Sequence, residues 1–325
     1  MRKILLALTL LSLTSASALA VEPSYQLTQR LSLGAATKWD FTSIDATRQR
    51  LFVTRGDHVD VLELPSGKSI GTIPDTHGVH GVAFAQDLKL GFTSNGKSNS
   101  VTVFDLDSLK TTAEIAITGV NPDAILYEPT VHKLFVFNGK SANVDVIDAT
   151  TLKVIDTVKA TGKPEFAVTD GHGKIYFNIE DKPGINIIDV VSNKLTATWK
   201  LKKCDEPSGL AIDVKHSRLF SACSNGIVAV TDTRTGKRAS QFAIGEHPDA
   251  VIYDIDNHLV LTSGGGGVGS LTVAHQDDAN HYTVRANIVT EKGAKTMAMN
   301  TTDKTVYLPA VVGDQFLVLV AEWKK

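Results

Sequence analysis

The sequence has only two cysteines, no long apolar run after residue 20, and no excess of positive charge. Without a later apolar stretch, no segment of the mature chain is expected to cross a membrane. Lys and Arg number 33 against 35 Asp and Glu. This balance argues against a protein built mainly to clamp nucleic-acid phosphates, which needs a surplus of cations on one face. We find no catalytic triad, redox centre or nucleophile motif.

The N-terminus has the three-part pattern of a secretory signal peptide. A short positive segment precedes the apolar residues 4–13, and Ala18 and Ala20 supply the small residues that a signal peptidase recognises. About ten apolar residues are too few to span a bilayer. We therefore predict a signal peptide over residues 1–20, cleaved near Ala20, and a periplasmic or secreted mature protein with a formal charge of −4.

One segment recurs seven times along the chain, at intervals of 41 to 45 residues. In each copy apolar and polar residues alternate, and most copies run into a cluster of Asp, Ser, Thr or Gly. Period-two alternation that ends in turn residues is typical of a half-buried strand entering a hairpin. The copies start at Val59, Val101, Val144, Ile185, Val228, Leu271 and Phe316, and the last two are weaker.

Three further short segments accompany each copy. Two precede it, such as 122–128 (PDAILYE) and 133–138 (KLFVFN), and one follows, such as 111–118 (TTAEIAIT). Four short strands in about 43 residues match one blade of a β-propeller. The sequence therefore predicts an all-β fold, a seven-bladed β-propeller of four-stranded blades that forms a single domain over residues 21–325.

The seventh copy ends at Lys325, before a fourth strand. The missing strand is found at the other end of the chain, where residues 25–34 (YQLTQRLSLG) resemble the fourth strand of another repeat. We predict that this N-terminal strand completes the last blade and closes the ring. Closure leaves no long unpaired inner edge that can aggregate.

Residues 134–178 resemble the YVTN-type repeat of bacterial YncE-like β-propellers, and the resemblance extends over the whole mature chain. No copy spells YVTN, and the nearest are LFVT at 51–54 and IYFN at 175–178. The sixth blade departs most, with four glycines at 264–267. The resemblance implies an exported scaffold or binding protein. Single-stranded DNA binding has been ascribed to such relatives, and propeller lactonases and lyases are more distant relations.

Aligning the repeats brings one residue from each blade to the entrance of its innermost strand. Four are carboxylates and one is a histidine, which predicts a negative mouth on the central channel. Such a mouth favours a hard cation such as Ca²⁺ or a cationic ligand, with Asp123, Glu165 and Asp249 as metal ligands. The aligned residues are Asp40, His80, Asp123, Glu165, Ser208, Asp249 and Thr296.

A second interpretation remains open for these residues. Asp and Glu after proline are turn signals, and their carboxylates can accept backbone N–H groups at a strand start. The loops that leave the second strands add Arg55 and Asn138 to the same mouth. Arg55 can pair with an anionic ligand group. Asn138 can bind a sugar or a carboxylate, or can serve as a turn residue.

The repeat alignment also places the two cysteines in one blade. Cys204 lies in the loop entering the fifth innermost strand, and Cys223 ends the second strand of that blade. An even pair in an exported protein favours a disulfide, so we predict one here. Free thiols or a cysteine nucleophile are the alternatives, although the repeat places no histidine beside either cysteine.

Three function hypotheses follow. The first is a non-catalytic exported scaffold, expected to be a monomer, that binds a small ligand or an envelope protein at the acidic mouth. The second is a metal-assisted hydrolase, lactonase or lyase that uses the carboxylates. The third is single-stranded DNA binding, which the negative charge and the lack of an aromatic row disfavour.

Overall fold

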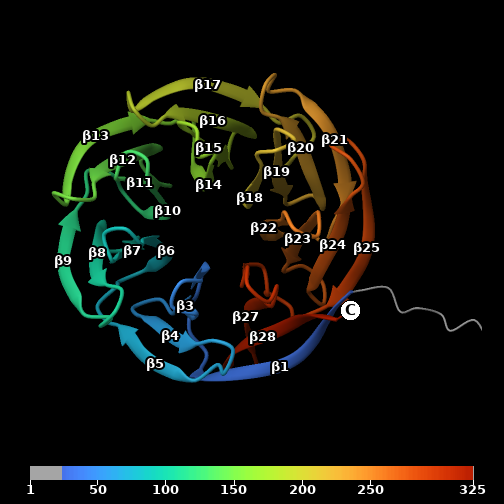
Figure 1. The fold of residues 1–325 in the computed structure, drawn as a ribbon, viewed down its shortest axis with the longest axis horizontal. Coiled ribbons are helices and arrows are strands. Elements are labelled where there is room, and N and C mark those ends of the chain that lie inside the picture. Colours follow the sequence, from blue (N-terminus) through green and yellow to red (C-terminus); the bar gives the residue numbers. More distant parts are fainter. Residues whose placement is uncertain (1–23, 325) are drawn as a thin grey trace, which may run out of the picture.

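The computed structural model describes residues 24–324, which form seven four-stranded antiparallel sheets around a central axis (Figure 1). The predicted signal peptide lies outside the described residues. The structure confirms the predicted seven-bladed, all-β fold. No helix in residues 24–324 is long and apolar enough to cross a membrane.

Each blade is listed from its innermost to its outermost strand. Blade 1 contains β2 (Thr42–Asp45), β3 (Arg50–Thr54), β4 (Val59–Glu63) and β5 (Ser69–Ile73). Blade 2 contains β6 (Val79–Ala85), β7 (Leu90–Asn95), β8 (Ser100–Asp105) and β9 (Thr111–Ala116). Blade 3 contains β10 (Pro122–Glu128), β11 (Lys133–Asn138), β12 (Asn143–Asp148) and β13 (Lys153–Lys159). Blade 4 contains β14 (Pro164–Thr169), β15 (Lys174–Ile179), β16 (Gly184–Asp189) and β17 (Lys194–Lys200). Blade 5 contains β18 (Leu210–Asp213), β19 (Arg218–Cys223), β20 (Ile227–Asp232) and β21 (Arg238–Ala243). Blade 6 contains β22 (Pro248–Asp254), β23 (Leu259–Gly264), β24 (Ser270–Gln276) and β25 (Tyr282–Val289). Blade 7 contains β26 (Ala298–Met299), β27 (Val306–Val312), β28 (Gln315–Lys324) and β1 (Ser24–Ala35).

The ring is closed by strands from the two ends of the chain. The N-terminal strand β1 pairs antiparallel with β28, from Ser24 opposite Lys324 to Ala35 opposite Gln315. Figure 1 shows the blue β1 lying along the red β28 at the rim of the disc. The predicted closure is therefore confirmed.

The recurrent aspartate at the end of the third strand builds the next turn. In blade 3, the Asp148 carboxylate accepts hydrogen bonds from the backbone N–H groups of Thr150 and Thr151, at 2.9 and 2.8 Å. Asp105 and Asp189 do the same with Ser108 and Ser192. An Asp side chain that binds the backbone two or three residues on favours a turn over a continuing strand. This explains why the segments end where the repeat predicts.

The apolar core lies between the blades. The second and third strands are buried along most of their length, whereas the outermost strands are largely exposed. Phe137 of blade 3 contacts Phe177 of blade 4, with ring centroids 5.1 Å apart. Within residues 24–324 the buried apolar side chains form seven clusters, each made by two neighbouring blades, so every blade packs on both of its neighbours.

Three innermost strands begin later than the sequence predicts. The repeat alignment opens these segments at Trp39, Pro207 and Lys295. In the structure, β2, β18 and β26 each start three residues later. In blade 1 a side chain takes the place of the backbone hydrogen bonds between strands. The backbone N–H of Asp40 donates to the hydroxyl of Thr54 at 2.9 Å.

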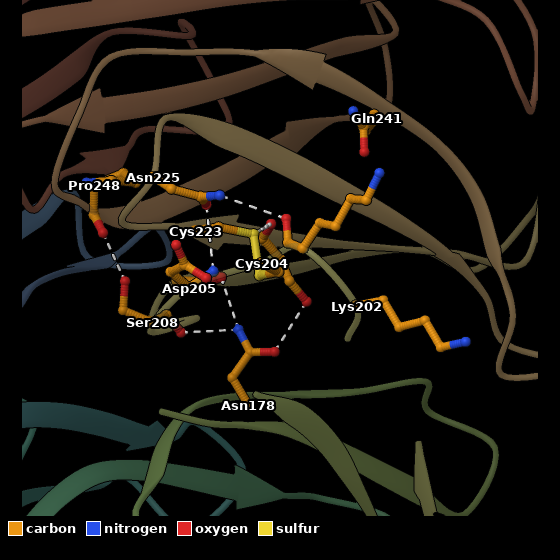
Figure 2. Close-up of a disulfide and its surroundings, with 12 residues drawn as sticks. Asn178, Lys202, Cys204, Asp205, Ser208, Cys223, Asn225, Gln241 and Pro248 are labelled. Carbon is orange, nitrogen blue, oxygen red and sulfur yellow. Dashed lines mark hydrogen bonds between the residues drawn. A yellow bond between two sulfur atoms is a disulfide. The ribbon is translucent and has the colours of Figure 1, made fainter. Parts of the chain in front are cut away.

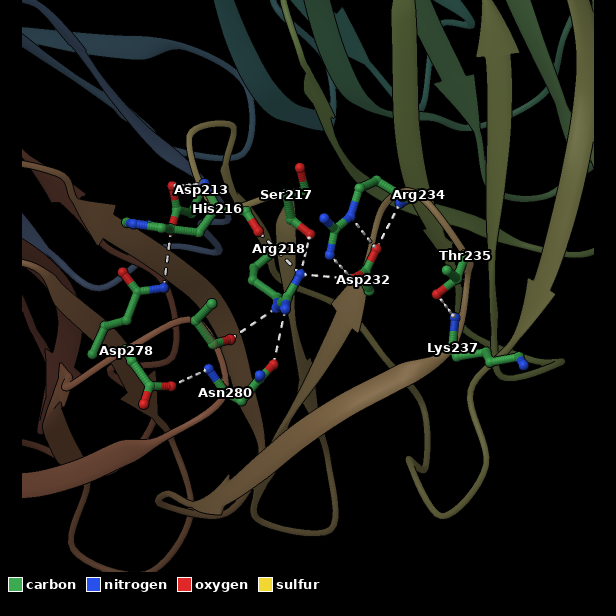
Figure 3. Close-up of polar contacts among 12 residues, drawn as sticks. Asp213, His216, Ser217, Arg218, Asp232, Arg234, Thr235, Lys237, Asp278 and Asn280 are labelled. Atoms are coloured by element: carbon green, nitrogen blue, oxygen red, sulfur yellow. Dashed lines mark hydrogen bonds and ion pairs between the residues drawn. The ribbon is translucent and has the colours of Figure 1, made fainter.

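A buried arginine at the start of β19 joins blades 5 and 6 (Figure 3). Arg218 is 4% exposed. Its guanidinium donates to the Asp232 carboxylate at 2.9 Å, and to the Ala279 carbonyl and the Asn280 side chain, both at 2.8 Å. The last two residues belong to the turn between β24 and β25. Arg218 therefore ties the second strand of one blade to a hairpin of the next.

Arg218→Ala is expected to lower the free energy of unfolding by about 3 kcal/mol, because it leaves Asp232 and two further acceptors without their buried partner. Arg234 contacts the same carboxylate at 2.6 Å, but its side chain is 67% exposed. Arg234→Ala is therefore the matched control, and its expected loss is much smaller because solvent screens this exposed pair. Urea unfolding measures both, and equal losses for the two variants would contradict this assignment.

Candidate functional site

The entrance residues of several blades meet at one small pocket on the channel axis. Its volume is about 160 Å³. Four of the predicted residues line it: Asp40, Asp123, Glu165 and Asp249. Four residues that were not assigned to the mouth complete it: Phe41, Lys163, Glu180 and Lys295. Apart from Phe41, every residue that lines the pocket is charged.

Aromatic rings narrow the channel beside this pocket. The ring of Phe41, next to β2 of blade 1, contacts the ring of Phe166 on β14 of blade 4. Their centroids are 5.3 Å apart and the rings meet edge to face. Two blades that are far apart around the ring thus touch across the axis. Phe41 also lines the charged pocket, so this aromatic contact lies directly beside it.

A histidine that does not itself line the pocket lies between two of the carboxylates that do. His80 Nδ1 lies 2.6 Å from Asp40 Oδ2 and 3.6 Å from Asp123 Oδ1. Burial alone would lower the pKa of His80, but the hydrogen bond to Asp40 and the charges of both carboxylates outweigh it and raise this pKa. The imidazolium therefore compensates part of the negative charge.

Two lysines that the sequence analysis missed compensate the other side. Lys163 Nζ lies 2.8 Å from Glu165 Oε1 and also contacts Glu180. Lys295 contacts Asp249. Burial alone would lower the pKa of both lysines, but the neighbouring carboxylates raise it. The available signal was a lysine one or two residues before the aligned mouth position, with Lys163 ahead of Glu165 and Lys295 ahead of Thr296.

Negative charge nevertheless exceeds positive charge in this pocket. Five carboxylates face two lysines and one histidine. Burial raises the pKa of Asp123, and the charge of Asp40 raises it further. Burial likewise raises the pKa of Glu165, with Asp123 adding to the effect, and that of Asp249. These three carboxyl groups therefore keep their protons to a higher pH than free carboxyl groups do.

Glu165→Gln is expected to flatten the pH dependence of stability. Because the pKa of Glu165 is raised on folding, the folded chain holds a proton that the unfolded chain releases above its ordinary pKa of about 4.3. This group therefore makes the free energy of unfolding fall as the pH rises from 5 to 8. Glutamine cannot titrate, so the variant should lose less stability over that range. Urea titrations at pH 5, 6.5 and 8 measure this, and parallel curves for both proteins would refute it.

The predicted metal ligands Asp123, Glu165 and Asp249 all line the pocket. Glu165 and Asp249 already contact lysine ammonium groups. The ligand atoms that lie closest together belong instead to Asp40, His80 and Asp123, all within 4.8 Å of one another. Oxygen ligands from these carboxylates suit a hard cation such as Ca²⁺.

The two predicted hydroxyl residues join neighbouring blades. Ser208 Oγ donates to the Pro248 carbonyl at 2.6 Å, and Thr296 Oγ1 donates to the Asp40 carbonyl at 2.8 Å. Each bond links the start of one innermost strand to that of the next blade. These side chains therefore fix the spacing of the carboxylates around the mouth.

The structure places Arg55 and Asn138 away from the pocket. Arg55 is 4% exposed and donates to Asp60 at 2.8 Å and to the Leu33 and Ala35 carbonyls of β1. It also lies 4.0 Å above the Phe316 ring. Asn138 is buried inside blade 3, where it donates to Asp145 at 3.2 Å. Arg55 thus supports the closing strand, and Asn138 supports its own sheet.

The structure confirms the predicted disulfide between Cys204 and Cys223 (Figure 2). It fastens the loop between blades 4 and 5 to the end of β19. Asn225 reinforces this attachment by accepting the Asp205 backbone N–H at 3.3 Å and donating to the Lys203 carbonyl at 3.5 Å. The long loop is therefore held at two places.

Replacing both cysteines by serine is expected to lower the free energy of unfolding by about 3 kcal/mol. The bridge closes a loop between residues 19 apart in sequence, and loops of this length restrict the unfolded chain by about that amount. Urea unfolding of the oxidised protein and the double variant measures the difference. Identical midpoints would show that the bridge does not stabilise this fold.

A comparison with protein-family models finds no match, and neither does a comparison with curated proteins. Similar solved structures are WD40 propellers and related chains. "Crystal structure of RRP9 WD40 repeats" has a TM-score of 0.79 at 10% identity and covers 93% of this chain and 100% of that chain. "Structure of U3-55K" has a TM-score of 0.76 at 10% identity, with coverage of 91% and 98%. "Crystal Structure of Mitotic Checkpoint Complex" has a TM-score of 0.79 at 13% identity, with coverage of 98% and 99%. At these identities the likeness shows the fold alone.

Proposed function

We propose that this protein is an exported, non-enzymatic binding propeller that takes a positively charged group into the pocket on its channel axis. One observation carries the proposal: five carboxylates line or border a pocket of about 160 Å³ that offers only two lysines and one histidine in compensation. Burial, and after it the charge of a neighbouring carboxylate, raises the pKa of Asp123 and Glu165, and an entering cation favours their charged forms. Binding a cation therefore stabilises the pocket more than binding a neutral ligand does.

The pocket volume limits what can enter. A space of this size accepts a metal ion with a few waters or the ammonium end of a larger molecule, but not a whole drug-sized ligand. A lysine side chain presented by a partner protein meets the same requirement. Lys163 and Lys295 already show that ammonium groups fit against these carboxylates.

The setting agrees with an exported binding protein. The signal-peptide pattern and a disulfide both belong to an oxidising compartment, and a YncE-like identity fits both. One similar solved structure is of a complex, and propellers commonly serve as protein-binding scaffolds. The negative pocket disfavours DNA binding there, because phosphates would be repelled.

A hydrolase is less well supported by the geometry. His80 and Asp40 resemble a base held by a carboxylate. Among residues 24–324, however, no Ser, Thr or Cys side chain hydrogen-bonds to His80, and the hydroxyls of Ser208 and Thr296 donate to backbone carbonyls. The lysines at the mouth instead position carboxylates for binding.

Thermal unfolding with two probes tests the proposal. Calcium chloride represents an inorganic cation, and n-butylammonium chloride represents a lysine side chain. Sodium chloride at equal ionic strength is the control. A probe at a hundred times its Kd stabilises by about 2.7 kcal/mol, which raises the melting temperature by several degrees. The probe that raises it identifies the ligand chemistry, and no rise with either one overturns the proposal.

A further inference from the structure

A second charged surface lies on the outer wall between blades 4 and 5. Here the end of β17 meets the turn between β20 and β21 and encloses a groove of about 460 Å³. Five cationic residues line it, four of them exposed lysines. The lining cations are Lys200, Lys202, Lys203, Lys237 and Arg238.

These five cations have no acidic partner among residues 24–324. None of them lies within 4.0 Å of a carboxylate oxygen, although Arg and Lys elsewhere form many such pairs. Asp205 and Glu206 follow Lys203 in the loop, but neither forms a salt bridge. Arg238 donates instead to the Gln241 side chain and to the Lys202 carbonyl, both at 2.5 Å. A protein with net negative charge thus concentrates uncompensated positive charge in one groove.

The groove is held rigid from below and from one side. Trp199 packs so closely on Gly236 that a Cβ there would lie 2.5 Å from the indole ring. Gly236 also has a φ of +67°, so both the close contact and the backbone conformation require glycine at this position. On the other side, the disulfide of Cys204 anchors the loop that carries Lys202 and Lys203 (Figure 2). Fixed cations bind an anionic partner with less loss of conformational entropy than mobile ones.

The surroundings of the groove favour an acidic peptide over other anions. The outer edge of β17 is unpaired, because β17 hydrogen-bonds only to β16, so an extended chain can align along it. Trp199 has Gly236 against one part of its ring and Tyr176 at 5.9 Å, and it is only partly exposed. The groove therefore offers no free aromatic face for stacking bases. No large exposed apolar residue lines it for insertion into a membrane.

We propose that the groove between blades 4 and 5 is a docking site for an acidic, extended segment of a partner protein. The cations bind its carboxylates, and the edge of β17 guides its backbone. This site is separate from the channel pocket, so its test does not depend on the proposed function.

Fluorescence anisotropy with a labelled decapeptide of alternating Glu and Thr tests this proposal. We expect binding that weakens as salt increases. The triple variant Lys200→Gln, Lys202→Gln, Lys203→Gln should weaken it at least tenfold. A matched triple variant on blade 3 (Lys140→Gln, Lys153→Gln, Lys159→Gln) loses the same charge from exposed positions and should stay within twofold. A decapeptide with Gln in place of Glu should not bind.

Two further probes distinguish the other anions. A ten-nucleotide oligothymidylate and vesicles containing phosphatidylserine are titrated under the same conditions. Tighter binding of either one, lost in the Lys200, Lys202 and Lys203 variant, would reassign the groove to nucleic acid or to a membrane. Absence of decapeptide binding up to 1 mM, or equal weakening in both triple variants, would overturn the site itself.

Discussion

A chain that begins at Ala36 is expected to lose cooperative folding, because it lacks the strand that closes the ring. β1 supplies the outermost strand of blade 7 and pairs with β28 along its length. Tyr25 is 2% exposed, and its hydroxyl donates to the Lys304 carbonyl at 2.9 Å. Arg55 of blade 1 would lose its acceptors on β1. Circular dichroism melting and size-exclusion chromatography should show a broad transition and aggregates.

A synthetic peptide of residues 24–35 provides the control for this truncation. If closure is the missing element, adding the peptide should restore a cooperative transition and a soluble species. A peptide with Tyr25→Ala should restore less, because the buried ring contributes about 3 kcal/mol or more. Cooperative melting of the truncated chain at the full-length temperature, without peptide, would show that the ring does not depend on this strand.

The double variant Asp123→Asn, Asp249→Asn is expected to weaken cation binding at least tenfold. Both carboxyl groups line the pocket, and the double variant leaves three carboxylates against two lysines and one histidine, which abolishes the excess of negative charge. Burial and neighbouring charges raise the pKa of both groups, so ionising them in the folded protein is unfavourable. Asparagine carries no charge, so it avoids this unfavourable ionisation. The variant should therefore be at least as stable as the original protein while binding the cation far more weakly. Residues that form a binding site often lower the free energy of unfolding.

The matched control changes the same charge elsewhere. Asp75 and Asp314 are exposed and form no salt bridge among the described residues. The variant Asp75→Asn, Asp314→Asn should bind the stabilising cation within twofold of the original protein. Isothermal titration calorimetry measures affinity, and thermal melting measures stability. Unchanged affinity in the pocket variant would place the cation elsewhere.

Much of the architecture could be predicted because it is repeated. Each aspartate at a strand end, such as Asp148, builds a local turn from its own side chain. Four of the seven blades end their third strand with such an aspartate, and a local pattern that recurs at a fixed spacing predicts the whole architecture. The closing strand was identified for the same reason, since Tyr25–Gly34 carries the pattern of a fourth strand. The pairing of Cys204 with Cys223 followed from their places in one repeat.

The candidate site was predicted only in part, because a repeat fixes the backbone position of a residue but not the direction of a long side chain. Arg55 aligns with the mouth residues, yet its side chain turns outward to β1. Lys163 and Lys295 lie ahead of the aligned positions, yet they reach into the pocket. The contact between Phe41 and Phe166 joins two blades across the propeller axis. No pattern among neighbouring residues in the sequence predicts such a contact.

Cation binding in exchange for protons is the central claim, and calorimetry in two buffers measures it directly. Calcium chloride or n-butylammonium chloride, whichever stabilises the protein, is titrated at pH 7 in Pipes and in Hepes, whose ionisation enthalpies differ. The observed heats should differ in the sense of proton release, because the entering cation lowers the raised pKa of the pocket carboxyl groups. Affinity should also rise with pH. Equal heats in both buffers and a pH-independent affinity would contradict the account.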